Sequence, residues 1–276
     1  MKKILIYHLY CGEDFLTNLA NKIHFICLSR YIHLFDEAKF TISVDDLSNA
    51  EIIGYGLQFV AALGSFEKTI NIRKNTDLYE VDTFGKDFLK RYNELDGMVF
   101  FAHNKGTTNF KNPDIDHDSV FNWICGMYYY NFNFIDEVEG FFTGKLRAPE
   151  VFYGTFLEYF SKEKQSWVHA MPNNPTGLMY SGTFYWINVP LYRNSVKMGV
   201  VKDVEPVNRF FAEEYPGMFF DRYAYGAGIT SHNDVCFDAI DVNLYHSTAD
   251  VWEKLFAELG DYEGVINFIN DIKKEL

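Results

Sequence analysis

The stretch GMVFFAHNKGTT, residues 97–108, passes from an apolar block directly into His103, Asn104, Lys105 and Gly106. A short continuous apolar run of this kind is typical of a strand that is buried on both faces of a parallel sheet. Ligands of such sheets bind beyond the carboxyl ends of the strands. The stretch therefore predicts a central strand that delivers polar residues to a ligand-binding edge.

The chain before this stretch alternates between strand and helix patterns. The expected strands are KILIYHLY (3–10), KFTISV (39–44) and KTINIR (68–73), and the expected helices are 13–34, 47–63 and 82–95. Short connections between alternating strands and helices indicate an α/β fold with a mostly parallel central sheet flanked by helices.

The chain after this stretch is less regular. We expect a long helix over 119–142, an aromatic strand after Ser181 and Gly182, a short helix over 208–217 that Pro216 and Gly217 end, and one or two amphipathic helices over 248–276. Linkers and repeats are absent from the sequence, so residues 1–276 are interpreted as a single domain with a helical C-terminal part.

Composition excludes several classes of protein. The chain has 276 residues, 48% of them hydrophobic, and a formal net charge of -13, which disfavours general nucleic-acid binding. Its four cysteines form no C-x-x-C pair and are interpreted as reduced thiols. The sequence contains neither a signal-peptide core nor a transmembrane-length apolar run, so we expect a cytoplasmic protein.

Two histidines end expected strands and are the first candidates for a binding site. After His103, Lys105 could supply positive charge to a phosphate, and Gly106 could let the backbone approach it closely. His8 ends the first strand in the same way. The alternatives are a polar turn with a surface lysine at 103–106 and a structural role for His8.

Carboxylates form two further candidate groups. Glu213 and Glu214 lie in an aromatic segment, and a carboxylate buried there would have a raised pKa suited to a general base; on a surface helix the pair would be solvated charge. The segment NPDIDHD, 112–118, places Asp114 and Asp116 as in a hard-cation site, or forms an acidic loop and helix cap.

The segment YSGTFYW, residues 180–186, is the fourth candidate. Ser181 and Gly182 could line the face of a sugar together with Tyr185 and Trp186, or form a turn that enters a core strand. The sequence has no G-x-S-x-G, G-x-G-x-x-G or G-x-x-x-x-G-K-[ST] motif, which argues against a serine hydrolase, a Rossmann dinucleotide enzyme and a P-loop NTPase.

The order of six motifs resembles that of glycosyltransferase-like proteins of bacteria and viruses that are encoded with capsule or surface-glycan genes. The motifs are IYHLY (6–10), YEVDTF (79–84), FFAHNKG (100–106), NWICGMYYYNF (122–132), MYSGTFYW (179–186) and NRFFAEEYPG (208–217). They are spread over nearly the whole span from residue 4 to about 220. The resemblance implies a GT-A-like fold that binds a nucleotide-diphosphate sugar at the carboxyl edge of its sheet and takes part in polysaccharide biosynthesis.

The same resemblance implies roles for individual residues. Residues 1–110 would form the nucleotide-binding half, 111–225 the donor-sugar and acceptor half, and 226–276 an extension. His8, Glu80 and Thr83 would lie near the nucleoside. His103, Lys105 and Gly106 would lie beside the diphosphate and donor sugar, Ser181, Gly182 and Trp186 would shape the sugar pocket, and Glu213 or Glu214 would be the catalytic carboxylate.

The chain departs from many GT-A enzymes at the position where a D-x-D motif would hold Mn²⁺ or Mg²⁺, because HNKG stands there. Either His103 and Asp116 ligate the metal, or Lys105 replaces it as a catalytic counter-charge to the leaving diphosphate. We expect a glycosyltransferase that uses a nucleotide sugar and a glycan acceptor. The alternatives are a non-catalytic carbohydrate- or nucleotide-binding protein with the same fold, and a metal-dependent hydrolase that uses DIDHD.

Overall fold

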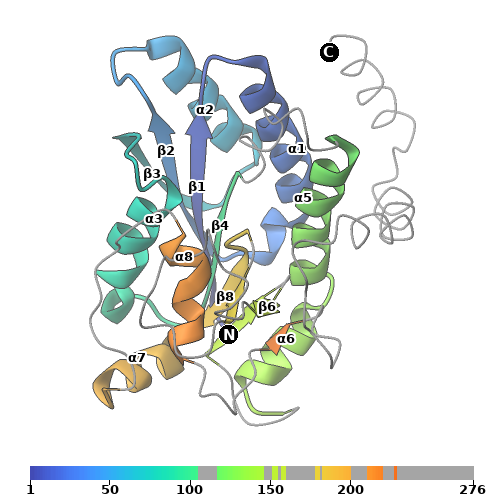
Figure 1. Cartoon of the computed structure of the whole chain (residues 1–276), viewed down its shortest axis with the longest axis vertical. Coiled ribbons are helices and arrows are strands. Elements are labelled where there is room, and N and C mark those ends of the chain that lie inside the picture. The colour runs from blue at the N-terminus through green and yellow to red at the C-terminus, as the bar shows by residue number, and fades with distance from the viewer. Residues whose placement is uncertain are drawn as a thin grey trace.

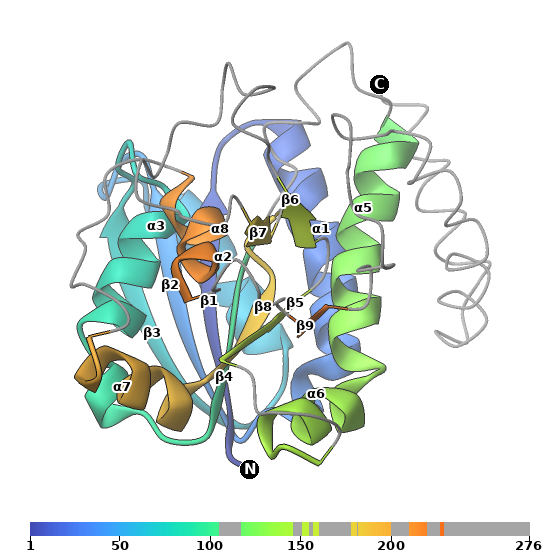
Figure 2. The ribbon, with the colours of Figure 1, turned by 60° about the horizontal axis from the view of Figure 1, so that its bottom comes forward.

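A mixed β-sheet runs through the centre of the computed structural model, and helices lie against both of its faces (Figure 1, Figure 2). The structure describes residues 1–104, 117–145, 151–154, 157–159, 178–180, 182–199, 210–219 and 227–228. None of the helices in these ranges combines the length and the apolar character that crossing a membrane requires.

The first half of the chain forms the regular part of the fold. Its elements are β1 (Lys3–Cys11), α1 (Phe15–Tyr31), the 3-10 turn η1 (Ile32–Leu34), β2 (Glu37–Val44), α2 (Ala50–Ala62), β3 (Glu67–Lys74), α3 (Glu80–Thr83), the π-helical turn η2 (Phe84–Leu89), the 3-10 turn η3 (Tyr92–Glu94) and β4 (Met98–His103). Asp14 and Asn49 begin α1 and α2, because their side chains accept hydrogen bonds from otherwise unpaired backbone N–H groups.

The second half adds shorter elements. They are α5 (His117–Phe132), α6 (Ile135–Phe142), β5 (Phe152–Gly154), β6 (Leu157–Tyr159), β7 (Leu178–Tyr180), β8 (Tyr185–Asn188), α7 (Val189–Lys197), α8 (Phe211–Glu214), the 3-10 turn η4 (Tyr215–Phe219) and β9 (Ala227–Gly228). β6 and β7 form a separate antiparallel pair.

The order of strands in the main sheet is β3-β2-β1-β4-β8-β5-β9. β3, β2, β1 and β4 are parallel, β8 runs antiparallel between β4 and β5, and the two-residue β9 extends β5 in parallel. From β1 the chain moves outward through β2 and β3 and then returns to place β4 on the other side of β1. The strand order therefore reverses between β1 and β4, and such a switch point is where open α/β sheets bind ligands.

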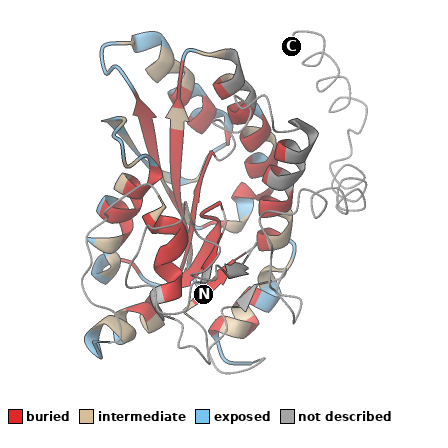
Figure 3. Cartoon of the chain, in the orientation of Figure 1, coloured by how far each residue is buried: buried red, intermediate tan, exposed pale blue. Residues whose placement is uncertain are grey.

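Side chains alternate between the two faces of the sheet, and each face has its own core. Buried residues, red in Figure 3, lie on the strands and on the helices beside them. Leu5, Tyr7 and Leu9 of β1 pack on the side of α1, α2, α5 and α6. Ile4 and Ile6 pack on the side of α3, α7 and α8, and His8 follows them on that face. The sheet thus separates two layers, and the α3–α8 layer holds the polar residues considered below.

The structure confirms the expected α/β class with a mainly parallel sheet and flanking helices, and it confirms the strand order of the first half and its first two helices. The expected helix over 82–95 is instead the short helix α3 followed by the π-helical turn η2 and the 3-10 turn η3. The expected helix over 119–142 is instead two helices, because Phe134 leaves the helical conformation with φ -110 and ψ 30. Pro216 and Gly217, which were expected to end a short helix, instead lie inside the η4 turn that continues from α8. The expected helices over 248–276 lie outside the described residues.

Candidate functional site

Two histidines lie side by side at the switch point of the sheet. In the parallel pairing of β1 with β4, His8 is the register partner of His103, which is the last residue of β4. Both side chains are almost fully buried. The sequence predicted each histidine at a strand end; β1 instead continues to Cys11, three residues beyond His8, and the strand order brings the two histidines together.

Helix α3 supplies the next two residues of the cluster. The Nδ1 atom of His8 lies 2.9 Å from the hydroxyl of Thr83, and a carboxylate oxygen of Glu80 lies 3.8 Å from Nε2 of His103. Glu80 and Thr83 are three residues apart and therefore share one face of the helical turn. This turn sets a carboxylate over one histidine and a hydroxyl over the other.

The turn between β7 and β8 joins the cluster through Gly182. Nε2 of His103 bonds the Gly182 carbonyl at 3.0 Å, and the Gly182 N–H donates to Oε1 of Glu213 at 3.1 Å. A carbonyl only accepts, so Nε2 of His103 carries the proton in this bond. Gly182 has φ +92 in a turn closed by the Thr183 N–H and the Tyr180 carbonyl, a conformation that favours glycine.

Backbone strain is concentrated beside these residues. Among the described residues, Tyr79 and Thr183 are the two non-glycine residues with positive φ, at +49 and +60. Tyr79 directly precedes Glu80, and Thr183 directly follows Gly182. A β-branched residue in this region is a clear outlier, and strained backbone gathers at ligand-binding and catalytic sites.

Burial determines the protonation state of His8. Desolvation of the charged ring lowers the pKa of His8 to about 4, the negative charge of Glu80 opposes this effect, and the neighbouring His103 lowers the pKa further. The ring is therefore neutral near pH 7. A neutral imidazole offers one donor and one acceptor, and the tautomer decides which of them faces the Thr83 hydroxyl.

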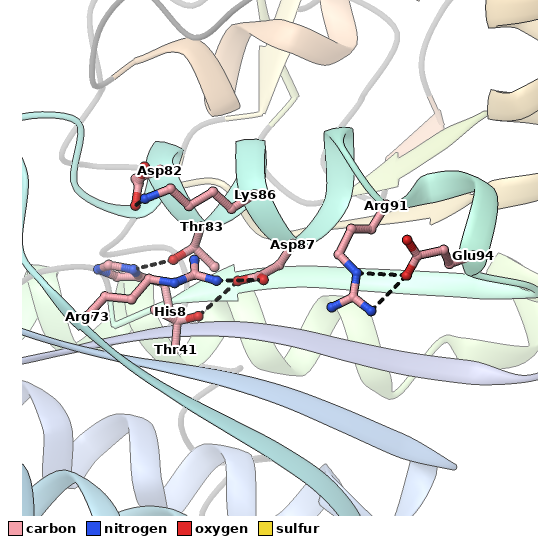
Figure 4. A network of polar contacts seen from close by, with 9 residues as sticks. All are labelled: His8, Thr41, Arg73, Asp82, Thr83, Lys86, Asp87, Arg91 and Glu94. Atoms are coloured by element: carbon pink, nitrogen blue, oxygen red, sulfur yellow. Dashed lines mark hydrogen bonds and ion pairs between the residues drawn. The ribbon is translucent and has the colours of Figure 1, made fainter.

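A second polar network anchors the segment that carries Glu80 and Thr83 (Figure 4). Asp87, one turn after Thr83, accepts a hydrogen bond from the Thr41 hydroxyl at 2.9 Å and forms an ion pair with Arg73 at 2.8 Å. Thr41 belongs to β2 and Arg73 to β3. The network ties the α3–η2 segment to two strands and so fixes the position of the site residues upon it.

Asn104 is a site residue that sequence reasoning missed. Its Oδ1 accepts from the Tyr10 N–H at 2.9 Å, and its Nδ2 donates to the Tyr10 carbonyl at 2.7 Å and to Oδ1 of Asn21 at 2.6 Å. The side chain thus continues the pairing of β4 with β1 for one more residue. Its place directly after a buried strand was the available signal, because an amide can imitate a backbone partner.

Trp186 does not join the cluster. Strand alternation directs it to the opposite face of the sheet from His103, where it packs on Phe35 and Phe100 and donates from Nε1 to the Asn131 carbonyl at 3.1 Å. Its side chain is fully buried there. This placement corrects the expectation that Trp186 shapes a sugar pocket. Glu214 is buried on α8 beside Glu213.

Four further candidates, Lys105, Gly106, Asp116 and Ser181, lie outside the described residues, as does the rest of the DIDHD segment before His117. Within the described ranges, no group of three or more His, Cys, Asp or Glu side chains is arranged to hold a metal ion. The described donors therefore do not by themselves provide a site for Mn²⁺ or Mg²⁺.

Comparison with known proteins does not place the chain in a family. No protein-family model matches it, and no curated protein matches its sequence. The function is therefore inferred from the geometry of the site and from the motifs in the sequence.

Proposed function

We propose that the protein transfers a glycosyl group from a nucleotide-diphosphate sugar to a hydroxyl group of a glycan or another acceptor. The observation that carries this proposal is a buried polar cluster at the switch point between β1 and β4. Five separate segments contribute to it: His8, Glu80 with Thr83, His103, Gly182 and Glu213. These are residues that the resemblance assigns to nucleotide, sugar and base.

Glu213 is the proposed general base. In an inverting transfer its carboxylate takes the proton of the acceptor hydroxyl while that oxygen forms a bond to the anomeric carbon of the sugar. The bond from this carbon to the diphosphate breaks, and the diphosphate leaves with the electron pair. The Gly182 N–H, which donates to Oε1 of Glu213, orients the carboxylate.

His103 is proposed as a positioning residue beside the departing diphosphate. Its Nε2–H holds the Gly182 carbonyl, so the same glycine connects the histidine and the base. Lys105, two residues beyond His103, is proposed to supply the positive charge that stabilises the leaving group.

A second candidate function is a nucleotide- or carbohydrate-binding protein without turnover. The observation that favours it is the burial of the cluster: His8, His103, Glu80 and Glu213 are all nearly inaccessible and engaged within the protein. Such a network also suits a structural role, because buried polar groups are normally satisfied internally. A fold adapted to a ligand does not require chemistry.

Binding is tested by thermal unfolding with UDP, GDP and other nucleoside diphosphates, each with and without Mn²⁺. A ligand at about 100 times its Kd should stabilise the native state by about 2.7 kcal/mol, which raises the melting temperature measurably. A melting temperature unchanged by every nucleotide and nucleotide sugar would contradict the transferase and a nucleotide-binding protein, and would leave only a carbohydrate-binding one.

Turnover separates the two candidates. We expect Glu213→Gln to reduce transfer or sugar-nucleotide hydrolysis by roughly 10²- to 10⁴-fold with nucleotide binding retained, because the amide keeps the acceptor for Gly182 but cannot take a proton. Lys105→Ala should lower the rate as well. The matched control is Glu51→Gln, an exposed carboxylate on α2. Binding without turnover in the wild type would favour the second candidate.

A further inference from the structure

Strand β3 forms an outer edge of the sheet. It pairs with β2, and no strand in the described part of the chain pairs with its other side. Ile70 and Ile72, two residues apart and therefore on the same face, are 37% and 41% exposed. A long edge strand with exposed apolar side chains is a surface on which another strand can pair.

Two positively charged side chains of β3, those of Lys68 and Arg73, already have partners within the protein. Lys68 caps the end of α2 through the carbonyls of Val60 and Gly64 at 2.9 and 2.7 Å, and Arg73 pairs with Asp87 at 2.8 Å. Charged residues on an edge normally discourage pairing. Here two of them are held in fixed positions by internal partners, so they constrain the register of a partner strand.

Helix α2 leaves the two isoleucines uncovered. It packs on β1 and β2, where Gly56 allows it to approach Ile42 closely. In the sheet register Ile70 neighbours Phe40 and Ile72 neighbours Ile42, so an apolar row continues from the covered strand to the exposed one. A second copy joined at this edge would extend that row.

We propose that β3 pairs antiparallel with β3 of a second copy of this chain, about a two-fold axis perpendicular to the sheet. Such an axis keeps each face of the sheet on the same side in both copies. Residues directly opposite each other must therefore point to the same side of the sheet. Allowed registers consequently differ by an even number of residues.

Two registers place the axis near the middle of β3, at Ile70 or at Asn71, and the charges of the strand favour Ile70. With Ile70 opposite its own copy, Glu67 faces Arg73 of the second copy at both ends, and Thr69 faces Asn71. In the neighbouring register, with Asn71 on the axis, Lys68 would face Lys74. Opposite charges across a strand pair stabilise it and like charges destabilise it. The sequence EKTINIRK is therefore self-complementary with Ile70 on the axis.

Of the side chains that the structure describes, only Arg73 connects this interface to the proposed glycosyl-transfer site, because it pairs with Asp87 of the η2 turn. β2 separates β3 from β1, and the polar cluster lies at β1 and β4. The dimer does not depend on the proposed function, and either can fail without the other.

The first test measures mass in solution by light scattering or sedimentation, from about 1 to about 200 µM, because a single strand pair is a small interface. The wild type should show a concentration-dependent dimer. Ile70→Lys should be monomeric, since it places two like charges together on the axis. Met198→Lys, at a residue that is 77% exposed beyond α7, should dimerise as the wild type does. A wild-type monomer at every concentration would overturn the proposal.

The second test determines the register by cross-linking. Directly opposed residues have Cβ atoms about 5 Å apart, close to disulfide range, so Ile70→Cys should form a covalent dimer on mild oxidation. Ile72→Cys is the matched control, because the two introduced thiols would lie about four residues apart along the strands, roughly 13 Å. Cross-linking of Ile72→Cys as fast as Ile70→Cys would overturn the register, and cross-linking of neither would overturn the pairing.

Discussion

His8 is a buried imidazole whose neutral form the fold requires. Its ring is held between the Thr83 hydroxyl and the neighbouring His103, and burial lowers its pKa to about 4 from a reference value near 6.5. The unfolded chain therefore binds a proton at this residue at a higher pH than the native protein does.

We expect His8 to make the native state less stable as the pH falls. The contribution of His8 to the free energy of unfolding is fully present above about pH 6.5. It is lost progressively toward pH 4, by on the order of 3 kcal/mol. His8→Gln keeps a hydrogen-bonding group near Thr83 but does not titrate. Urea unfolding at pH 7, 6 and 5 should show a shallower decline for this variant than for the wild type; equal declines would contradict the assignment.

Asn104 is the residue with the most demanding hydrogen-bond geometry near the site. Its Nδ2 donates to two acceptors, the Tyr10 carbonyl and Asn21 Oδ1, while its Oδ1 accepts from a backbone N–H. An aspartate of the same shape would place a carboxylate oxygen against both acceptors.

We therefore expect Asn104→Asp to destabilise the protein by about 1–3 kcal/mol at pH 7, because buried donors are replaced by a charged acceptor. Asn93→Asp, at an exposed position, is the control. Denaturant midpoints give the comparison. A loss at Asn104 no larger than the loss at Asn93 would show that the side chain is not needed to continue the strand pairing.

At the scale of elements, α2 contains two glycines with different surroundings. A Cβ at Gly56 would lie 2.7 Å from Ile42 Cγ2 and 3.1 Å from Cys11 Sγ, whereas a Cβ at Gly54 would meet no atom within 4 Å. Gly56 therefore sets how closely the helix approaches the sheet, and Gly54 only weakens the helix.

The two alanine variants should change stability in opposite directions. Gly54→Ala should stabilise by about 0.5–1 kcal/mol through helix propensity, and Gly56→Ala should destabilise because overpacking costs about 1–3 kcal/mol. Both are measured by urea unfolding, and each serves as the control for the other. An increase in the stability of Gly56→Ala would show that the Ile42 side chain can move aside without destabilising the protein.

The elements of the first half could be predicted from the sequence because their patterns are local. Apolar runs such as 98–103 and the helical spacing in α1 depend on residues near one another in the chain. The break at Phe134 and the π-helical turn Phe84–Leu89 could not be predicted in the same way. In the π-helical turn, Phe84 and Phe88 pack on Phe101 and Tyr192, which lie far away in the sequence; the break at Phe134 has no explanation of this kind in the part of the chain that the structure describes.

At the scale of the whole molecule, the candidate site could be predicted in composition but not in arrangement. His8, Glu80, Thr83, His103, Gly182 and Glu213 were identified individually from the sequence, whereas their proximity depends on the strand order. Trp186 shows the limit of such prediction. It shares a motif with Gly182, yet alternation along β8 places the Trp186 side chain on the face of the sheet opposite the polar cluster. Adjacency in sequence did not determine which layer it joined.

The antiparallel strand β8 has a consequence for the order in which the molecule folds. β4 can pair with β1 as soon as both strands have been synthesised, but the carbonyl that accepts from His103 lies 79 residues further along the chain, and the carboxylate that accepts from Gly182 lies 31 residues beyond that. A chain emerging from the ribosome can build the parallel strands long before these contacts exist. Until β8 has been synthesised, one edge of β4 in the first half of the chain has no strand partner. The polar cluster is complete only after Glu213 has been synthesised.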